Sequence, residues 1–245
     1  MTALPLQGKS ALVTGGARRI GREIALALAR AGADVAITYR TSNVDAANTV
    51  DELTALGVDA LAVECDVRCE PSVRAAVGAV VERFGRLDIL VNSAAVFDSG
   101  SLDSLTLEQW DAVFETNTRG PFLVAREAIP HLHSSHGRII NIGSLGGLRA
   151  WATHGHYCAS KAALHMLTQA MAKAFAPDVA VNCVAPGWIE MNEQPSDAAV
   201  RFADKTPMRH NGTAADVAQA VVFFATGPGF VTGQILAVDG GLGLA

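Results

Sequence analysis

The sequence has 245 residues, of which 50% are hydrophobic and 18% are charged, and its formal net charge at pH 7 is −5. An acidic balance argues against nucleic acid as the main partner, because phosphate backbones bind basic surfaces. The apolar run 221–225 is too short to cross a bilayer, and the first ten residues lack the basic and apolar regions of a signal peptide. We therefore expect a cytoplasmic protein that binds neither nucleic acid nor membrane.

Short apolar runs alternate with longer segments of helical periodicity along the whole chain. The predicted strands lie at 10–14, 34–40, 60–65, 89–92, 138–142, 179–184 and 235–238. The predicted helices lie at 20–31, 44–56, 71–84, 107–116, 120–132, 156–175 and 214–224. This alternation predicts an α/β fold, with residues 1–245 in a single domain and a doubly wound parallel sheet of Rossmann type. We expect about seven strands, helices on both faces, and ligands beyond the carboxyl ends of the strands.

A glycine-rich turn follows the first predicted strand and opens the first predicted helix. It reads Thr-Gly-Gly-Ala-Arg-Arg-Ile-Gly over residues 14–21. Glycine lets the backbone approach a ligand closely, and the start of a helix offers free N–H groups to a pyrophosphate. A purely structural turn is the alternative, but the strand–turn–helix context favours a nucleotide site. The candidate cofactor-binding residues of this turn are Thr14, Gly15, Arg19, Ile20 and Gly21.

The end of the second predicted strand carries the sequence Tyr-Arg-Thr-Ser at residues 39–42. Sheets of this kind that bind NAD place an acidic residue near this point, where it holds the ribose 2′-hydroxyl. This chain instead offers a cation, Arg40, and two hydroxyls, Thr41 and Ser42. A solvated arginine is the alternative, but a guanidinium that pairs with a 2′-phosphate favours NADP(H) as the cofactor.

A tyrosine and a lysine four residues apart, Tyr157 and Lys161, fall on one face of a predicted helix. A nearby ammonium favours the phenolate and is expected to lower the pKa of Tyr157 towards the working range of an acid–base catalyst. Ser144 lies just beyond the strand 138–142, where its hydroxyl can hold a substrate oxygen. These three residues, together with a nucleotide turn, predict a catalytic site.

These motifs resemble the short-chain dehydrogenase/reductase family over essentially the whole chain. The matching positions are Thr14, Gly15, Gly21, Asp66, Val67, Asn92, Ser93, Ala94, Asn117, Ser144, Tyr157, Lys161, Pro186, Gly187 and residues 239–241. The resemblance implies that Tyr157 donates the proton in a reduction, and that Lys161 lowers the pKa of Tyr157 and holds the nicotinamide ribose. It implies that Ser144 orients a carbonyl and that Asn117 supports a water relay. Implied cofactor contacts are Asp66 and Val67 to the adenine, Asn92 and Ala94 along the cleft, and Pro186, Gly187 and Ile189 over the nicotinamide.

Three positions depart from the usual family pattern. Arg19 replaces a glycine of the first turn, which resembles pteridine reductases. Characterised members of that group carry Asp where this chain has Ser144, so Ser144 favours a general carbonyl reductase. Ser93 stands in a turn that usually reads Asn-Asn-Ala-Gly, and Met191 replaces a threonine that commonly meets the nicotinamide carboxamide.

The substrate is a small-molecule carbonyl or heterocycle, and its determinants are expected in a substrate loop near 188–208. A 3-oxoacyl thioester and a small ketone are consistent with Ser144, whereas a pterin or quinone-type heterocycle is consistent with Arg19 and with Trp151 and Trp188 beside the cleft. A non-catalytic nucleotide sensor is a further alternative, but it predicts the loss of a catalytic residue.

No metal site is expected, because the cluster His131, His133 and His136 has no nearby cysteine or carboxylate in sequence. The segments 120–132 and 159–175 are more apolar than one buried stripe requires. Together with the family resemblance, they predict a homotetramer.

Overall fold

The computed structural model describes residues 3–191 and 196–244. Its centre is one parallel sheet with the strand order β3-β2-β1-β4-β5-β6-β7. The strands are β1 (Ser10–Thr14), β2 (Asp34–Tyr39), β3 (Ala60–Glu64), β4 (Ile89–Asn92), β5 (Arg138–Ile142), β6 (Ala180–Pro186) and β7 (Ile235–Val238). All seven predicted strands are confirmed, and their bounds differ from the prediction by at most two residues.

The helices fill the crossovers between the strands, as the alternating pattern predicts. They are α1 (Arg19–Arg30), α2 (Asn43–Ala55), α3 (Glu70–Phe84), α4 (Leu107–Phe114), α5 (Gly120–Ser135), α6 (Gly155–Ala174), α7 (Asp197–Lys205) and α8 (Ala214–Thr226). Three short helical turns complete the described chain: η1 (Glu115–Arg119), η2 (Leu145–Gly147) and η3 (Leu242–Leu244).

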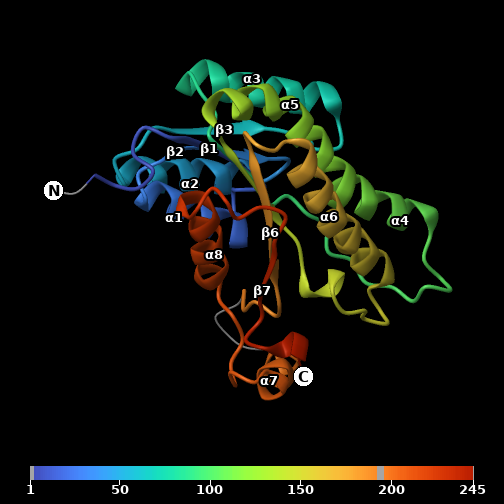
Figure 1. Ribbon diagram of the computed structural model, residues 1–245. Helices are drawn as coiled ribbons and strands as arrows, with labels where there is room; N and C mark the ends of the chain where they lie inside the picture. The colour runs from blue at the N-terminus through green and yellow to red at the C-terminus, as the bar shows by residue number, and fades with distance from the viewer. Residues whose placement is uncertain (1–2, 192–195, 245) are drawn as a thin grey trace.

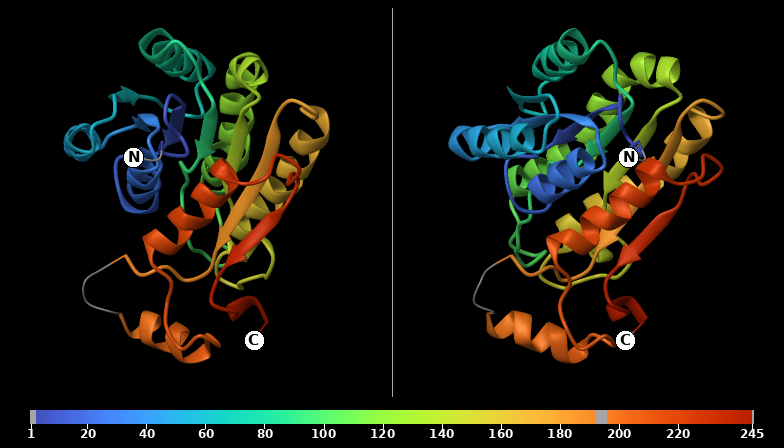
Figure 2. Two further views of the ribbon diagram at one scale, coloured as in Figure 1. Left: turned by 60° about the vertical axis from the view of Figure 1, so that its left-hand side comes forward. Right: turned by 90° about the vertical axis from the view of Figure 1, so that its left-hand side faces the viewer.

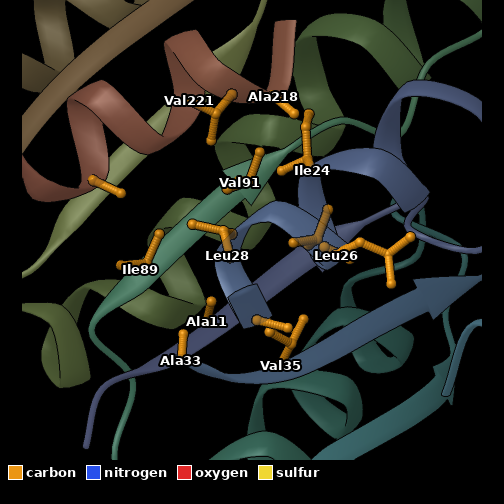
Figure 3. Packing of buried hydrophobic residues seen from close by; sticks show 14 of the residues in the cluster. Ala11, Ile24, Leu26, Leu28, Ala33, Val35, Ile89, Val91, Ala218 and Val221 are labelled. Carbon is orange, nitrogen blue, oxygen red and sulfur yellow. The ribbon is translucent and has the colours of Figure 1, made fainter. Parts of the chain in front are cut away.

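Two hydrophobic cores lie on opposite faces of the sheet. Alternate residues of β1 supply them: Ala11 and Val13 belong to the core beneath α1 and α8, and Leu12 belongs to the core beneath α3 and α5. Figure 3 shows the first core, where Leu28 and Ile24 of α1 face the sheet beside α8. Helices therefore cover both faces (Figure 1), and the doubly wound fold predicted from the sequence is confirmed.

The direction in which the chain winds reverses between β1 and β4, because β2 and β3 lie on one side of β1 and β4–β7 lie on the other. The carboxyl ends of neighbouring parallel strands meet at one edge, so the segments after β1, β2, β3 and β4 converge there. This reversal is where doubly wound sheets bind their ligands.

Two elements differ from the predicted helices. The helix predicted at 107–116 is α-helical only as far as Phe114. The chain then continues as the π-helical turn η1, a form that is frequent at functional sites. The helix α7 lies within the expected substrate loop near 188–208, and Figures 1 and 2 show it beyond the end of the sheet, apart from both helical layers. Residues 192–195 of that loop lie outside the described residues.

Among the described residues, no helix combines the length and the apolar character needed to span a membrane.

Two helices whose sequences are unusually apolar also carry exposed apolar side chains. Phe122 of α5 is 42% exposed and Met166 of α6 is 65% exposed. Such side chains at the surface are typical of contacts with another protein chain. The homotetramer itself stays a prediction.

Replacement of Met166 by Asp tests this prediction. We expect the wild type to have about four times the chain mass of 25.5 kDa and the variant to have a lower mass, because a carboxylate in an apolar interface is costly. Light scattering at one protein concentration measures both. Phe230→Asp, at a fully exposed position in the α8–β7 loop, is the matched control, and a monomeric wild type would contradict the prediction.

Candidate active site

The glycine-rich turn after β1 is packed too closely for larger residues. A Cβ on Gly21 would lie 2.3 Å from the carbonyl oxygen of Gly15. Gly15 has a φ of 65°, and a Cβ there would lie 2.9 Å from Cα of Ala94. Glycine at both positions thus brings the start of α1 against the segment after β4 and leaves the turn's backbone open to a ligand.

Arg19, which replaces a family glycine, begins α1 with a φ of 54°. This left-handed conformation costs a non-glycine residue roughly 1 kcal/mol, which explains why glycine is usual at this position. The strained residue lies on the cavity wall beside Arg18. Backbone strain of this kind is typical of functional sites.

A cavity of about 370 Å³ follows the carboxyl edge of the sheet from the glycine turn to the segment after β4. Ten of the predicted cofactor-binding residues line it: Gly15, Arg19, Ile20, Gly21, Arg40, Thr41, Ser42, Asp66, Val67 and Ala94. Sequence reasoning did not single out Phe97 or Thr116, which also line it. Met191, identified only as a missing threonine, forms part of the same wall.

Thr14 and Asn92 lie beneath the cavity rather than on its wall. The hydroxyl of Thr14 accepts hydrogen bonds from the amides of Ser93 (3.0 Å) and Ala94 (3.1 Å). The amide nitrogen of Asn92 donates to Oδ1 of Asn141 at 2.9 Å. Both side chains are buried and hold the floor of the cavity in shape.

Three predicted nicotinamide contacts do not line the cavity: Pro186 is the last residue of β6, and Gly187 and Ile189 follow that strand. The amide of Gly187 donates to the carbonyl of Val238 at 2.9 Å. A Cβ on Gly187 would lie 2.7 Å from Cβ of Asp239. Gly187 is therefore required by the close approach of the segments after β6 and β7.

Asp66 reaches the cavity after β3, but its carboxylate is already paired. Nε and Nη2 of Arg68 donate to it, the latter at 2.6 Å. These hydrogen bonds lower the pKa of Asp66 to about 2, and Arg40 also contributes through its charge. The negative charge of Asp66 is therefore balanced by Arg68, and the positive charges of Arg18, Arg19 and Arg40 on the cavity wall are not cancelled by it.

The predicted catalytic residues Ser144 and Tyr157 are brought together. Ser144 follows β5, and its hydroxyl accepts the amide hydrogen of Gly146 at 3.0 Å. Tyr157, at the start of α6, is 9% exposed, and the nearby Ser144 side chain acts to lower its pKa. Two hydroxyls thus point to one place at the carboxyl edge of the sheet.

Lys161 lies one turn of α6 beyond Tyr157 and is buried. Its Nζ donates to the carbonyl of Ile142 at 2.8 Å and lies 5.9 Å from the centroid of the Tyr157 ring. Burial lowers the pKa of Lys161 to about 8.

The pKa of Tyr157 differs from the sequence expectation. Burial raises it above the ordinary value, and the Ser144 side chain opposes this rise only in part. The ammonium of Lys161 donates to the carbonyl of Ile142 rather than to the phenol oxygen. A raised pKa keeps the phenol protonated at neutral pH, which suits a proton donor.

Asn117 lies in η1 and is fully buried. Its side chain accepts the amide hydrogen of Val96 (2.8 Å), donates to the carbonyl of Val96 (2.9 Å) and donates to the hydroxyl of Ser160 (3.1 Å). Among the described residues, Asn117 therefore joins the segment after β4 to the catalytic helix.

Two buried histidines beside the site had no assigned role in the sequence. Nε2 of His165 accepts the amide hydrogen of Ser144 at 3.4 Å, and burial, with the charge of Lys161, lowers the pKa of His165 to about 4. His165 is thus a neutral acceptor behind Ser144. His156 is fully buried, and its Nε2 lies 3.8 Å from a carboxylate oxygen of Asp98.

Aromatic rings surround the catalytic tyrosine. Phe97 and Trp151 each contact both Tyr157 and His154. Trp188 stacks on Phe202 of α7 at 4.3 Å between centroids. Trp151 thus lies beside Tyr157 as predicted, together with Phe97, which sequence reasoning did not single out, whereas Trp188 packs against α7.

Within the described ranges, no group of histidine, cysteine or acidic residues is arranged to hold a metal ion. His133 and His136 instead face Asp178, at 3.3 and 3.5 Å.

Known proteins are similar to this chain over nearly its whole length. The family model described as Enoyl-(Acyl carrier protein) reductase matches residues 15–243. The chain is 38% identical over 240 residues to the 3-oxoacyl-[acyl-carrier-protein] reductase FabG of Staphylococcus aureus, covering 96% of this chain and 98% of that protein.

Solved structures match over the same length. A short-chain dehydrogenase from Burkholderia cenocepacia in complex with NADP is 44% identical with a TM-score of 0.89, covering 97% of this chain and 99% of the other. A blue fluorescent protein from a metagenomic library in complex with NADPH is 37% identical with a TM-score of 0.91, again covering 97% and 99%. Fold and sequence thus agree over nearly the whole chain, and the chain belongs to the short-chain dehydrogenase/reductase family of oxidoreductases.

Proposed function

We propose that this protein is an NADPH-dependent reductase that transfers hydride to a carbonyl group, with Tyr157 as the proton donor. The observation that carries the proposal is the convergence of three side chains: Ser144 is close enough to Tyr157 to lower its pKa, and the ammonium of Lys161 lies 5.9 Å from the centroid of the Tyr157 ring. These side chains supply an acid and a second oxygen-binding hydroxyl at the switch point of the sheet.

The cavity fits a phosphorylated dinucleotide. Arg18, Arg19 and Arg40 line it, and Thr41 and Ser42 add hydroxyls at the end of β2. Arginine binds phosphate through several parallel hydrogen bonds, and the glycine turn gives the pyrophosphate access to backbone N–H groups. The structures with NADP and NADPH at 44% and 37% identity support the same cofactor for this chain.

When bound, NADPH supplies the hydride. Ser144 and Tyr157 hold the substrate oxygen between their hydroxyls, and Tyr157 passes its proton to that oxygen as negative charge develops. The raised pKa of Tyr157 keeps its proton in place until then. Lys161 provides a nearby positive charge that stabilises the phenolate left behind.

For the substrate we propose a 3-oxoacyl thioester or a small ketone. Ser144 and the 38% identity to a 3-oxoacyl-[acyl-carrier-protein] reductase support this class. A pterin or quinone-type heterocycle is the second candidate, supported by Arg19 on the cavity wall and by the rings around Tyr157.

Tyr157→Phe tests the reaction itself. We expect kcat to fall by about 10²- to 10⁴-fold with every accepted substrate, because general acid catalysis contributes that much. NADPH oxidation is measured against ketones, 3-oxoacyl thioesters, quinones and pterins. A variant that keeps most of the turnover would show that Tyr157 is not the donor, and turnover of pterins or quinones alone would favour the second candidate.

Arg40→Ala tests the cofactor assignment. We expect the KM for NADPH to rise by about 10-fold or more, since a hydrogen bond to a charged group contributes about 1.5–3 kcal/mol, while the KM for NADH stays unchanged. Arg30→Ala, at the far end of α1 beside Glu23, is the matched control. An equal rise for both cofactors would place Arg40 away from the 2′-phosphate.

Lys161→Met tests the energetic cost of the buried ammonium. We expect the variant to lose turnover but to gain about 1–3 kcal/mol in the free energy of unfolding at pH 7, less the lost hydrogen bond to Ile142. Urea unfolding at one protein concentration measures this, with the exposed Lys173→Met on the same helix as the control.

The pH dependence of that difference has a definite sign. The pKa of Lys161 is about 8 in the folded protein and 10.5 ordinarily, so the unfolded chain binds more protons between these values. The wild type therefore gains stability relative to Lys161→Met as the pH rises from 8 to 10.5. A constant difference across this range would contradict burial of a charged lysine.

A further inference from the structure

Four rings, one of them that of the proposed proton donor Tyr157, are linked by four ring–ring contacts. Phe97 lies edge-on to Tyr157 and stacks on His154, with 4.8 Å between centroids in both pairs. Trp151 lies edge-on to His154 at 5.7 Å and nearly parallel to Tyr157 at 6.4 Å. We name Phe97, Trp151 and His154, around Tyr157, the aromatic rim.

The aromatic rim is not explained by packing of the core. The largest fully buried side chains are all leucine or isoleucine. Phe, Trp and Tyr make up only 6% of the chain, yet two of the three rim residues are Phe and Trp, and the residue they surround is a tyrosine. Rings are thus gathered at the catalytic mouth although aliphatic side chains fill the interior.

The rim is also open to a ligand. Phe97 is 61% exposed, and Leu148 and Met191 beside the mouth are 51% and 42% exposed. Phe97 and Met191 line the cofactor cavity, so this apolar surface continues directly from it. Exposed apolar groups that converge on polar catalytic atoms are typical of a substrate pocket.

Trp151 also lies near the hydroxyl of Ser144. A Cβ on Gly146 would lie 3.4 Å from Oγ of Ser144 and 3.5 Å from the Trp151 ring. Trp151 therefore stands beside Ser144 and Phe97 stands beside Tyr157. A substrate whose oxygen reaches the Tyr157 hydroxyl therefore lies near the rings of Phe97 and Trp151.

Backbone contacts fix the two loops that carry the rim. The amide of Gly100 donates to the carbonyl of Thr153 at 2.9 Å, and Gly100 forms a bridge with His154. A Cβ on Gly155 would lie 2.6 Å from the Leu102 side chain, so the loops are in close contact. The rings are held in place before a substrate arrives, which reduces the entropy cost of binding.

The rim presents ring faces rather than charge. Burial and the neighbouring His156 lower the pKa of His154, although Asp98 opposes this, so His154 is neutral at pH 7. Arg149 follows Leu148, but its guanidinium donates to the carbonyls of Leu242 and Gly243. The mouth therefore favours an uncharged, flat group over an anionic one.

From this geometry we infer that the substrate is a ketone that bears an aromatic ring next to its carbonyl, and that Phe97 and Trp151 determine this specificity. The inference rests on the proposed function and narrows its substrate class. In the reaction the C=O π bond breaks, a C–H bond forms with the hydride of NADPH, and an O–H bond forms with the Tyr157 proton. The products are an aryl carbinol and NADP⁺.

Acetophenone and cyclohexyl methyl ketone test the inference, because they differ only in whether the ring is aromatic. In Phe97→Leu and Trp151→Leu we expect kcat/KM for acetophenone to fall by about three- to tenfold, the range that an aromatic pair contributes. For cyclohexyl methyl ketone we expect a change below about twofold. Phe230→Leu, fully exposed in the α8–β7 loop, is the matched control and should change neither.

Each ratio of variant to wild type is taken within one ketone, so the different intrinsic reactivities of the two substrates cancel. Equal losses with both ketones would overturn the inference, as would a wild type that turns over 3-oxoacyl thioesters or the cyclohexyl ketone but not acetophenone. Either result leaves the reductase activity intact.

A second measurement separates failure of the proposed function from failure of the inference. Acetophenone binding to the NADPH complex of Tyr157→Phe is followed by quenching of tryptophan fluorescence, with and without Phe97→Leu. If no carbonyl is reduced, the proposed function fails, yet weaker binding on loss of Phe97 still supports the aromatic rim. Unchanged binding overturns it.

Discussion

The pairing of β1 with β4 is the contact on which the rest of the site depends. The two strands run in parallel from Ala11 opposite Ile89 to Thr14 opposite Asn92, and the direction of winding reverses between them. Beyond their ends, the hydroxyl of Thr14 accepts hydrogen bonds from the amides of Ser93 and Ala94. These bonds fix the position of the segment after β4 relative to the end of β1, where the glycine turn begins. The cavity opens there because no crossover helix covers a reversal point.

The residues that we propose as catalytic depend on the same edge for a different reason. Their polar atoms are taken out of water by the helices packed around them, which raises the pKa of Tyr157 and lowers that of Lys161. Burial therefore keeps the donor protonated and at the same time makes the nearby cation costly. His165 and Asn117 accept hydrogen bonds from the backbone amides of Ser144 and Val96, so these buried groups of the loops that carry the site have partners. Active-site residues commonly lower the stability of the folded protein in this way.

The aromatic rim shows how two loops with little pattern of their own acquire a function. Residues 97 and 151 lie far apart in the sequence, and neither falls in a helix or strand. Both rings contact Tyr157 and His154, because the loops after β4 and β5 leave neighbouring strands and are then joined by a hydrogen bond between Gly100 and Thr153. The substrate end of the cleft is thus a product of tertiary contacts, whereas the cofactor end is built mainly from one local turn.

The sequence by itself determined the fold class, the seven strands and the glycine turn, and it predicted the catalytic set, because strand and helix periodicity and short-range spacing are local properties. Tyr157 and Lys161 share a helix face through spacing alone. The tertiary structure decided what distant segments do to one another: the raised pKa of Tyr157, the role of Thr14 and Asn92 as buried supports, the pairing of Asp66 with Arg68, and the meeting of Phe97 with Tyr157. These depend on burial and on contacts between residues far apart in the chain, which no periodicity encodes.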